Sequence, residues 1–76
     1  MQFVTILRIV KKFCGDLIKA ARTNLGMTRR ELAERCGVSE KTIWNWEKGK
    51  TTPSVNDLPW IAESLQRSEE WFFGQS

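Results

Sequence analysis

The chain has 76 residues, of which 41% are hydrophobic and 28% are charged, and its formal net charge is +3. This length suits one small domain without a second, ligand-sensing or catalytic one, so we expect no small-molecule effector. Histidine is absent, and Cys14 and Cys36 are too few for a metal site or a disulfide framework. We therefore expect no metal, no cofactor and no enzymatic activity. No apolar run reaches the roughly 20 residues of a membrane span, so we expect a cytoplasmic protein without a membrane partner.

The basic residues gather in the first two thirds of the chain. Residues 1–50 carry eleven Lys and Arg against five Asp and Glu, a balance of +6, whereas residues 51–76 carry one against four, a balance of −3. A one-sided positive charge is typical of a surface that faces nucleic-acid phosphates. A mildly basic surface is also common among small bacterial domains, so charge alone does not decide the function.

Residues 1–13 are expected to form an apolar extension, and residues 14–76 the folded domain. Within the extension, Phe3, Ile6 and Val10 follow helical spacing, but residues 3–9 also alternate as a strand would. A strand would need a partner from a second subunit, so residues 3–10 are predicted to help build a homodimer. As a helix, the segment would pack on the rest of its own domain.

The remainder of the chain is predicted to be all-α, with five helical segments. Their ends are marked by capping residues and by glycines, and they span residues 16–24, 29–36, 40–48, 55–65 and 69–73. Thr28 and Glu31 have the spacing of a capping box before the second segment. Helical spacing predicts an inward set made of Leu17, Ile18, Ala21, Leu25, Leu32, Ala33, Cys36, Ile43, Trp46, Leu58, Trp60, Ile61, Ala62, Leu65 and Trp71.

Residues 28–49 hold the most informative pattern, two short amphipathic helices joined by a turn at Gly37. Two helices joined in this way form a helix-turn-helix, whose second helix enters the DNA major groove. The outward face of that helix carries groups that can read base edges. Lys41 can donate to guanine, Asn45 can pair with adenine, and Glu40 can accept from cytosine.

Short motifs follow one another in a fixed order along the chain from Leu17 to Gly74. They are Ile18…Ala21-Arg22…Leu25-Gly26-Met27-Thr28, Glu31-Leu32-Ala33, Gly37-Val38-Ser39, Ile43…Trp46-Glu47-Lys48-Gly49, Pro53 and Ser68…Trp71-Phe72-Phe73-Gly74. In this order and spacing, the chain closely resembles the Cro/lambdoid-repressor (XRE-type) helix-turn-helix family. The resemblance implies a compact five-helix, lambda-repressor-like domain that binds a pseudo-palindromic operator in double-stranded DNA as a homodimer.

The resemblance also implies a role for individual residues. The groove-facing, base-reading set would be Glu40, Lys41, Trp44 and Asn45. The residues near backbone phosphates would be Arg29, Thr42, Lys48, Lys50 and Thr51. An ion pair between Arg22 and Glu47 would tie the first helix to the third. The family usually has a small or polar residue at the position of Trp44. This tryptophan would contact a sugar or a thymine methyl group, pack on a neighbouring loop or partner, or cover nearby aliphatic stems.

The sequence therefore predicts a sequence-specific DNA-binding transcriptional regulator of the repressor kind that reads the major groove with residues 40–48. An antitoxin or protein-binding adaptor with the same fold is the alternative. The apolar segment 3–10 and the outward Trp44 favour that alternative.

Overall fold

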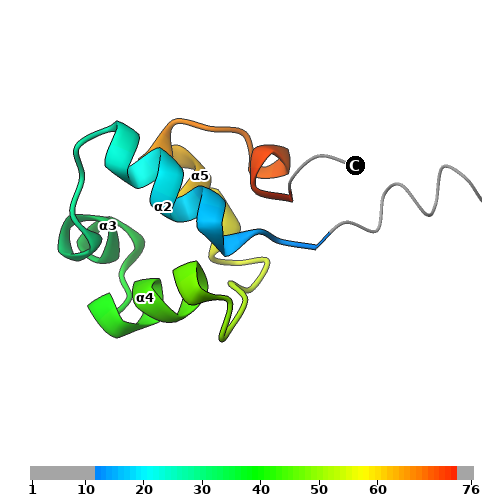
Figure 1. Ribbon diagram of the computed structural model, residues 1–76, viewed down its shortest axis with the longest axis horizontal. Coiled ribbons are helices and arrows are strands. Elements are labelled where there is room, and N and C mark those ends of the chain that lie inside the picture. Colours follow the sequence, from blue (N-terminus) through cyan, green and yellow to red (C-terminus); the bar gives the residue numbers. More distant parts are fainter. Residues whose placement is uncertain (1–11, 74–76) are drawn as a thin grey trace, which may run out of the picture.

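The computed structural model describes residues 12–73. These residues form four α-helices and a short 3-10 helix, with no strand among them (Figure 1). In chain order, the elements are α2 (Gly15–Asn24), α3 (Arg29–Cys36), α4 (Glu40–Lys48), α5 (Leu58–Leu65) and the 3-10 helix η1 (Glu69–Phe73). The predicted conformation of residues 3–10 and their predicted part in a homodimer lie outside the described residues.

The prediction of five α-helices is not matched, because the fifth segment is a 3-10 helix. η1 has only five residues and opens with a tight turn in which the Trp71 N–H donates to the Ser68 carbonyl oxygen (3.1 Å). Short pieces of this kind favour the tighter i to i+3 hydrogen bonding of a 3-10 helix. The architecture is therefore a compact all-helical body of four α-helices closed by one short turn of 3-10 helix.

Local capping chemistry fixes the ends of α3 and α4, as predicted. At the start of α3, Thr28 Oγ1 accepts from the Glu31 N–H (3.0 Å), while Glu31 Oε1 accepts from the Thr28 N–H (2.8 Å). Ser39 Oγ accepts from the Thr42 N–H (3.0 Å) at the start of α4. α3 ends at Gly37 and α4 at Gly49, and both glycines have the left-handed backbone conformation. This conformation carries little steric strain in a residue that has no Cβ.

The fourth predicted segment begins at Leu58 rather than at residue 55. A hydrogen-bonded turn occupies residues 54–57, where Asp57 Oδ2 accepts from the Ser54 hydroxyl (3.0 Å) and the Ser54 N–H (3.3 Å). Because α5 begins at Leu58, Pro59 lies in its first turn, where its missing N–H costs no intrahelical hydrogen bond.

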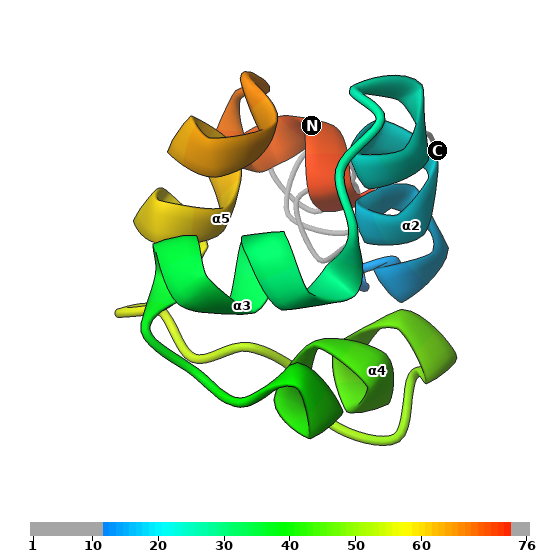
Figure 2. The same ribbon diagram turned by 90° about the vertical axis from the view of Figure 1, so that its left-hand side faces the viewer.

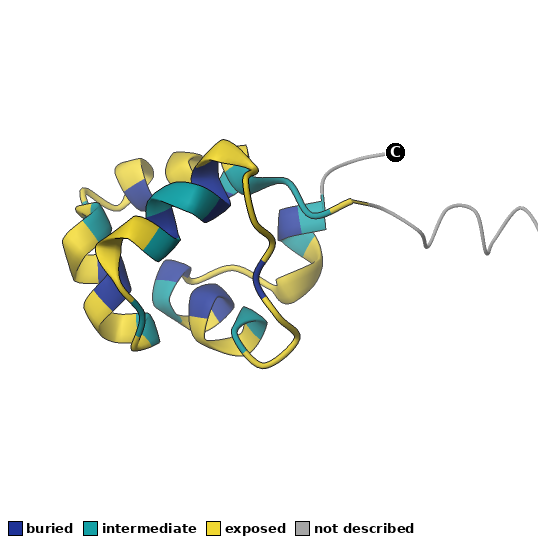
Figure 3. Ribbon diagram, turned by 90° about the horizontal axis from the view of Figure 1, so that it is seen from below, coloured by how far each residue is buried: buried dark blue, intermediate teal, exposed yellow. Residues whose placement is uncertain are grey.

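The core lies where the four helices and η1 meet, and Figure 3 shows the buried residues on the inward sides of the helices. The buried hydrophobic residues are Ile18, Ala21, Leu32, Ala33, Ile43, Trp46, Ile61, Ala62, Leu65 and Phe72. Two predicted core residues are wrong. Leu25 is 40% exposed because it follows the last residue of α2, and Trp60 is 56% exposed because it precedes the inward Ile61 and points off that face.

The start of α2 lies directly against the end of α4 (Figure 1). A Cβ atom added to Gly15 would lie 1.8 Å from the Trp46 carbonyl oxygen, closer than any real contact. The absence of a side chain at Gly15 therefore allows the two backbones to approach. This contact fixes α2 across α4, and it has no signature in the local sequence pattern.

The two ends of the described chain also meet. The Cys14 N–H donates to the Phe72 carbonyl oxygen (2.7 Å). Phe13, the last residue of the predicted extension, stacks on Phe72 with ring centroids 6.1 Å apart and meets the edge of Phe73 at 5.7 Å. Phe13 thus packs on the core of the domain. None of the helices within residues 12–73 has the length and apolar character needed to cross a membrane.

Candidate nucleic-acid interface

The residues of α3 and α4 form the helix-turn-helix that the sequence predicts. Figure 2 shows α3 lying across the molecule with α4 beneath it, joined by a short turn. In that turn, Gly37 has a φ of 71°, and the Val38 N–H donates to the Ala33 carbonyl oxygen (3.0 Å). The Val38 side chain packs against the core. The turn therefore holds the two helices at a fixed angle.

One side of α4 faces inward and the opposite side is open. Ile43, Trp46 and Glu47 are buried, and no other described element covers the outer side of α4 at the lower edge of the molecule in Figure 1. The four predicted groove-facing residues lie outside this buried stripe. Glu40 and Lys41 are exposed, while Trp44 and Asn45 are half-buried.

The predicted phosphate-contacting residues lie at the start of α3 and around the two ends of α4. Lys48, Lys50 and Thr51 are exposed around the end of α4. The chain folds back there, since the Asn45 carbonyl oxygen accepts from the Lys50 N–H (2.9 Å) and the Thr51 N–H (3.4 Å). At the start of α4, the Thr42 hydroxyl shares a hydrogen bond with the Ser39 hydroxyl (2.8 Å), so it belongs to the cap of the helix.

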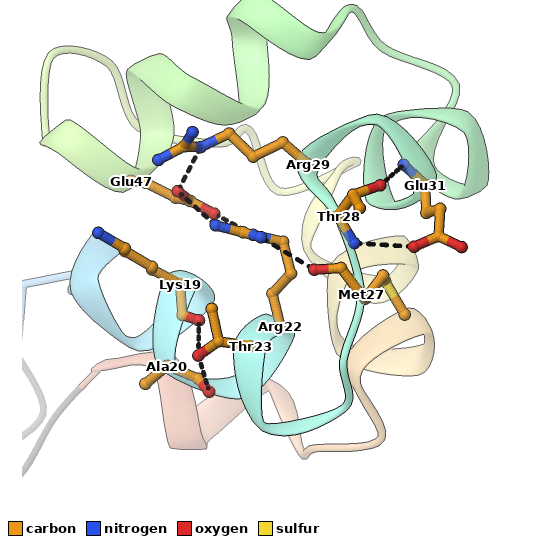
Figure 4. Close-up of polar contacts among 9 residues, drawn as sticks. All are labelled: Lys19, Ala20, Arg22, Thr23, Met27, Thr28, Arg29, Glu31 and Glu47. Atoms are coloured by element: carbon orange, nitrogen blue, oxygen red, sulfur yellow. Dashed lines mark hydrogen bonds and ion pairs between the residues drawn. The ribbon is translucent and has the colours of Figure 1, made fainter.

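Glu47 is the centre of a buried polar network that joins three helices (Figure 4). Arg22 binds its carboxylate with two nitrogens, Nε to Oε2 at 2.7 Å and Nη2 to Oε1 at 3.3 Å. The remaining Arg22 nitrogen, Nη1, donates to the Met27 carbonyl oxygen (2.9 Å). The structure thus contains the ion pair between α2 and α4 that the family resemblance implied, with both side chains removed from solvent.

Arg29 makes a further contact that sequence reasoning missed. Its Nε donates to Glu47 Oε1 (2.8 Å), while its side chain remains 29% exposed. Two guanidinium groups therefore share one carboxylate, and this corner keeps a surplus positive charge. Because Arg29 and Glu47 lie on different helices and 18 residues apart, no helical spacing connects them in the sequence.

Trp44 is surrounded by ammonium groups rather than covering aliphatic stems alone. The ring centroid lies 4.6 Å from Lys41 Nζ, 5.5 Å from Lys50 Nζ and 5.9 Å from Lys48 Nζ. These distances lie in the range of cation–π contacts. The outer face of α4 therefore carries a compact positive patch built on one aromatic ring.

Cys36 packs against the core. Cys36 is half-buried on α3, and burial raises the pKa of its thiol, which disfavours the reactive thiolate. In residues 12–73, no three His, Cys, Asp or Glu side chains gather closely enough to hold a metal ion.

Comparison with known proteins assigns the family. Residues 18–72 match the model of the family described as helix-turn-helix (HTH_3). The chain belongs to the helix-turn-helix family. The resemblance to XRE-type, lambda-like repressors is thereby confirmed.

Two relatives that share this domain are named as HTH-type transcriptional regulators. An uncharacterized HTH-type transcriptional regulator of Methanothermobacter thermautotrophicus is 47% identical over 51 residues, which are 67% of this chain and 74% of that protein. Another, from Rickettsia prowazekii, is 34% identical over 68 residues, which are 90% of this chain but only 52% of that protein. The chain thus spans about half the length of this second relative.

Among solved structures, the P22 c2 repressor, in complex with a synthetic operator, superimposes with a TM-score of 0.79. Its sequence is 28% identical to this chain, and the superposition covers 86% of this chain and 98% of that chain. The fold is therefore that of lambda-like repressor domains.

Proposed function

We propose that this chain is a sequence-specific, DNA-binding transcriptional regulator that reads the major groove of duplex DNA with α4. The observation that carries the proposal is the uncovered outer side of α4, which follows the turn of a helix-turn-helix and holds polar groups of suitable chemistry. The likeness to the P22 c2 repressor, whose structure contains an operator, supports it.

In this proposal, three outward residues of α4 read bases. Asn45 pairs with the hydrogen-bonding edge of adenine, Lys41 donates to guanine acceptors, and Glu40 accepts from the amino group of cytosine. The exposure of Glu40 and Lys41 and the half-buried position of Asn45 beside them support these roles. Together they cover successive positions along one face of the helix.

Residues at the start of α3 and around the two ends of α4 contact the DNA backbone and set the register of the protein. The proposed set is Arg29, Thr42, Lys48, Lys50 and Thr51. Phosphate contacts position a protein on the duplex, whereas base contacts specify the sequence. The exposed cations after α4 and the surplus charge at Arg29 support this division.

We also propose that the chain acts as a non-enzymatic repressor and binds a pseudo-palindromic operator as a homodimer. A two-fold dimer would place two copies of α4 about 34 Å apart in successive major grooves. The likeness to the P22 c2 repressor supports this. Light scattering of the protein with and without duplex tests it, and a single chain per duplex at saturation would contradict it.

Selection from random duplexes, followed by titration of the enriched site, tests the main proposal. One symmetric sequence is expected to be enriched. Asn45→Ala is expected to weaken binding to that site by about 1–3 kcal/mol and to relax the preference at one base position in each half. Asn24→Ala, an exposed amide at the end of α2, is the matched control and should change neither property. An unchanged affinity and site preference for Asn45→Ala would exclude α4 as the reader.

A further inference from the structure

The indole of Trp44 connects three lysines that come from different parts of α4 and its following turn. Lys41 precedes Trp44 by three residues and Lys48 follows it by four, so the three side chains share one face of the helix. The left-handed Gly49 turns the chain back, and the Lys50 N–H bonds to the Asn45 carbonyl oxygen (2.9 Å). This turn brings Lys50 Nζ to 5.5 Å from the same ring.

These three lysines form no ion pair within residues 12–73. Within residues 12–73, the ion pairs are Arg22–Glu47 and Arg29–Glu47, and neither involves these lysines. Like charges this close repel one another, and the negative face of the indole offsets only part of that repulsion. The cluster of Lys41, Trp44, Lys48 and Lys50 is therefore best stabilised by an anion.

We propose that Trp44 is a positioning residue that holds these three ammonium groups ready for DNA, without reading a base itself. This inference rests on the proposed function and refines it. A lysine ammonium has three N–H donors, and a ring on one side leaves donors on the other side free for a phosphate or a guanine edge. Because the long side chains are ordered before DNA arrives, less conformational entropy is lost on binding.

The arrangement of the free protein is tested first, by NMR. Protons of the ε-methylene groups of Lys41, Lys48 and Lys50 are expected to show an upfield ring-current shift relative to those of Lys19, whose ammonium has no ring contact in the described residues. The shift should shrink in Trp44→Phe, which has a smaller ring, and vanish in Trp44→Leu. Wild-type lysines that match Lys19 would overturn the inference.

DNA binding is tested next, by titration of the wild-type chain and its variants over a range of salt concentrations. Trp44→Leu is expected to weaken binding about tenfold, because the three lysine side chains must then be ordered only when DNA binds. The loss should appear on unrelated duplexes and be larger on the selected site, where Lys41 reads a base, and Trp44→Phe should lose less. Equal affinity and equal salt dependence in Trp44→Leu and wild type would overturn the inference.

A double-mutant cycle, in a variant that lacks these three lysines, distinguishes a positioning role of Trp44 from direct contact with DNA. When Lys41, Lys48 and Lys50 are all replaced by alanine, Trp44→Leu should cause no further loss. A further loss in that background, or a changed preferred sequence, would show that the indole touches the DNA itself and would overturn the inference. If the wild-type chain binds no duplex at all, the proposed function fails, while the NMR result still decides whether the indole gathers the lysines.

Discussion

At the scale of single residues, Glu47 joins the helix-turn-helix to α2 through a buried ion pair. It is 4% exposed, and its two carboxylate oxygens accept hydrogen bonds from Arg22 and Arg29. Buried charges are tolerated only when they are paired and hydrogen-bonded. The Glu47 side chain therefore ties α4 to both α2 and α3.

Removing the Glu47 carboxylate is expected to destabilise the folded domain. Glu47→Ala leaves the buried Arg22 guanidinium without its partner, which lowers the free energy of unfolding by about 3–5 kcal/mol. Glu63→Ala is the control, because Glu63 is exposed on α5 and has no ion pair within residues 12–73. Urea denaturation measures both. A Glu47→Ala variant as stable as the control would mean that the pair contributes nothing to folding.

At the scale of helices, the contact between α2 and α4 depends on Gly15. Alanine normally stabilises a helix relative to glycine by roughly 0.5–1 kcal/mol. Here a Cβ would lie 1.8 Å from the Trp46 carbonyl oxygen, and that oxygen belongs to the backbone. Gly15→Ala is therefore expected to push α2 away from α4.

The expected result is a loss of at least about 1–3 kcal/mol in the free energy of unfolding, the usual range for overpacking. Ala20→Gly, at an exposed position of α2, calibrates the ordinary effect of glycine in this helix. Chemical denaturation of both variants checks the prediction. An increase in stability for Gly15→Ala would contradict the close approach.

The capping box of α3 gives the domain a pH-dependent element. Hydrogen bonds from the Thr28 N–H and hydroxyl lower the pKa of Glu31 below its ordinary value. A lowered pKa in the folded state means that the charged carboxylate stabilises the fold above the unfolded pKa, about 4.3. That stabilisation is lost as the pH falls through the lower, folded-state pKa.

Comparison with Glu31→Gln isolates this effect, because glutamine can still accept the Thr28 N–H bond without a charge. Wild type should melt at a higher temperature than Glu31→Gln at pH 7, and the difference should disappear in acid below the ordinary glutamate range. Thermal melts from pH 7 to about pH 2 would show this. A difference that grows in acid would reverse the sign and reject the assignment.

At the scale of the whole molecule, the excess of basic residues in the first two thirds of the chain should make DNA affinity depend on salt. Affinity for DNA is expected to fall steeply with salt, because cations that contact phosphates release counterions from the duplex. Lys50→Ala should weaken selected and unrelated sites alike and flatten the salt slope by about one unit. Arg67→Ala is the control, since Arg67 stacks on Trp71 at 4.7 Å, in the acidic part of the chain. A loss confined to one sequence would assign Lys50 to base reading.

Helix ends and helix faces, which depend only on residues close together in the chain, were predictable from the sequence. Thr28 with Glu31, Ser39 and Gly37 set helix ends through hydrogen bonds and backbone conformations that involve only a few positions. The outward set of α4 was predictable for the same reason, because helical spacing alone sorts Asn45 from the buried Trp46. Most of the core and the candidate reading face therefore followed from periodicity.

Contacts between distant segments were not predictable in this way. Gly15 against Trp46 and Arg29 on Glu47 depend on how the helices cross, and no local pattern encodes that geometry. Trp60 was misassigned from helical spacing, because the inward face of α5 passes through Ile61 and Ala62 and leaves Trp60, one residue earlier, turned outward. The hydrogen-bonded turn at residues 54–57 also replaces the predicted first turn of α5, so the helix begins at Leu58.

The meeting of Phe13 with Phe72 and Phe73 means that the described chain forms a nearly closed ring. The packing of the helices should therefore not depend on where within residues 12–73 the chain is opened. A circular permutant that joins residue 73 to residue 12 by a short glycine linker, and opens between the exposed Val55 and Asn56, should rebuild the same core. In such a permutant, α5 would come first in the chain and α4 last, while the helices kept their places in space.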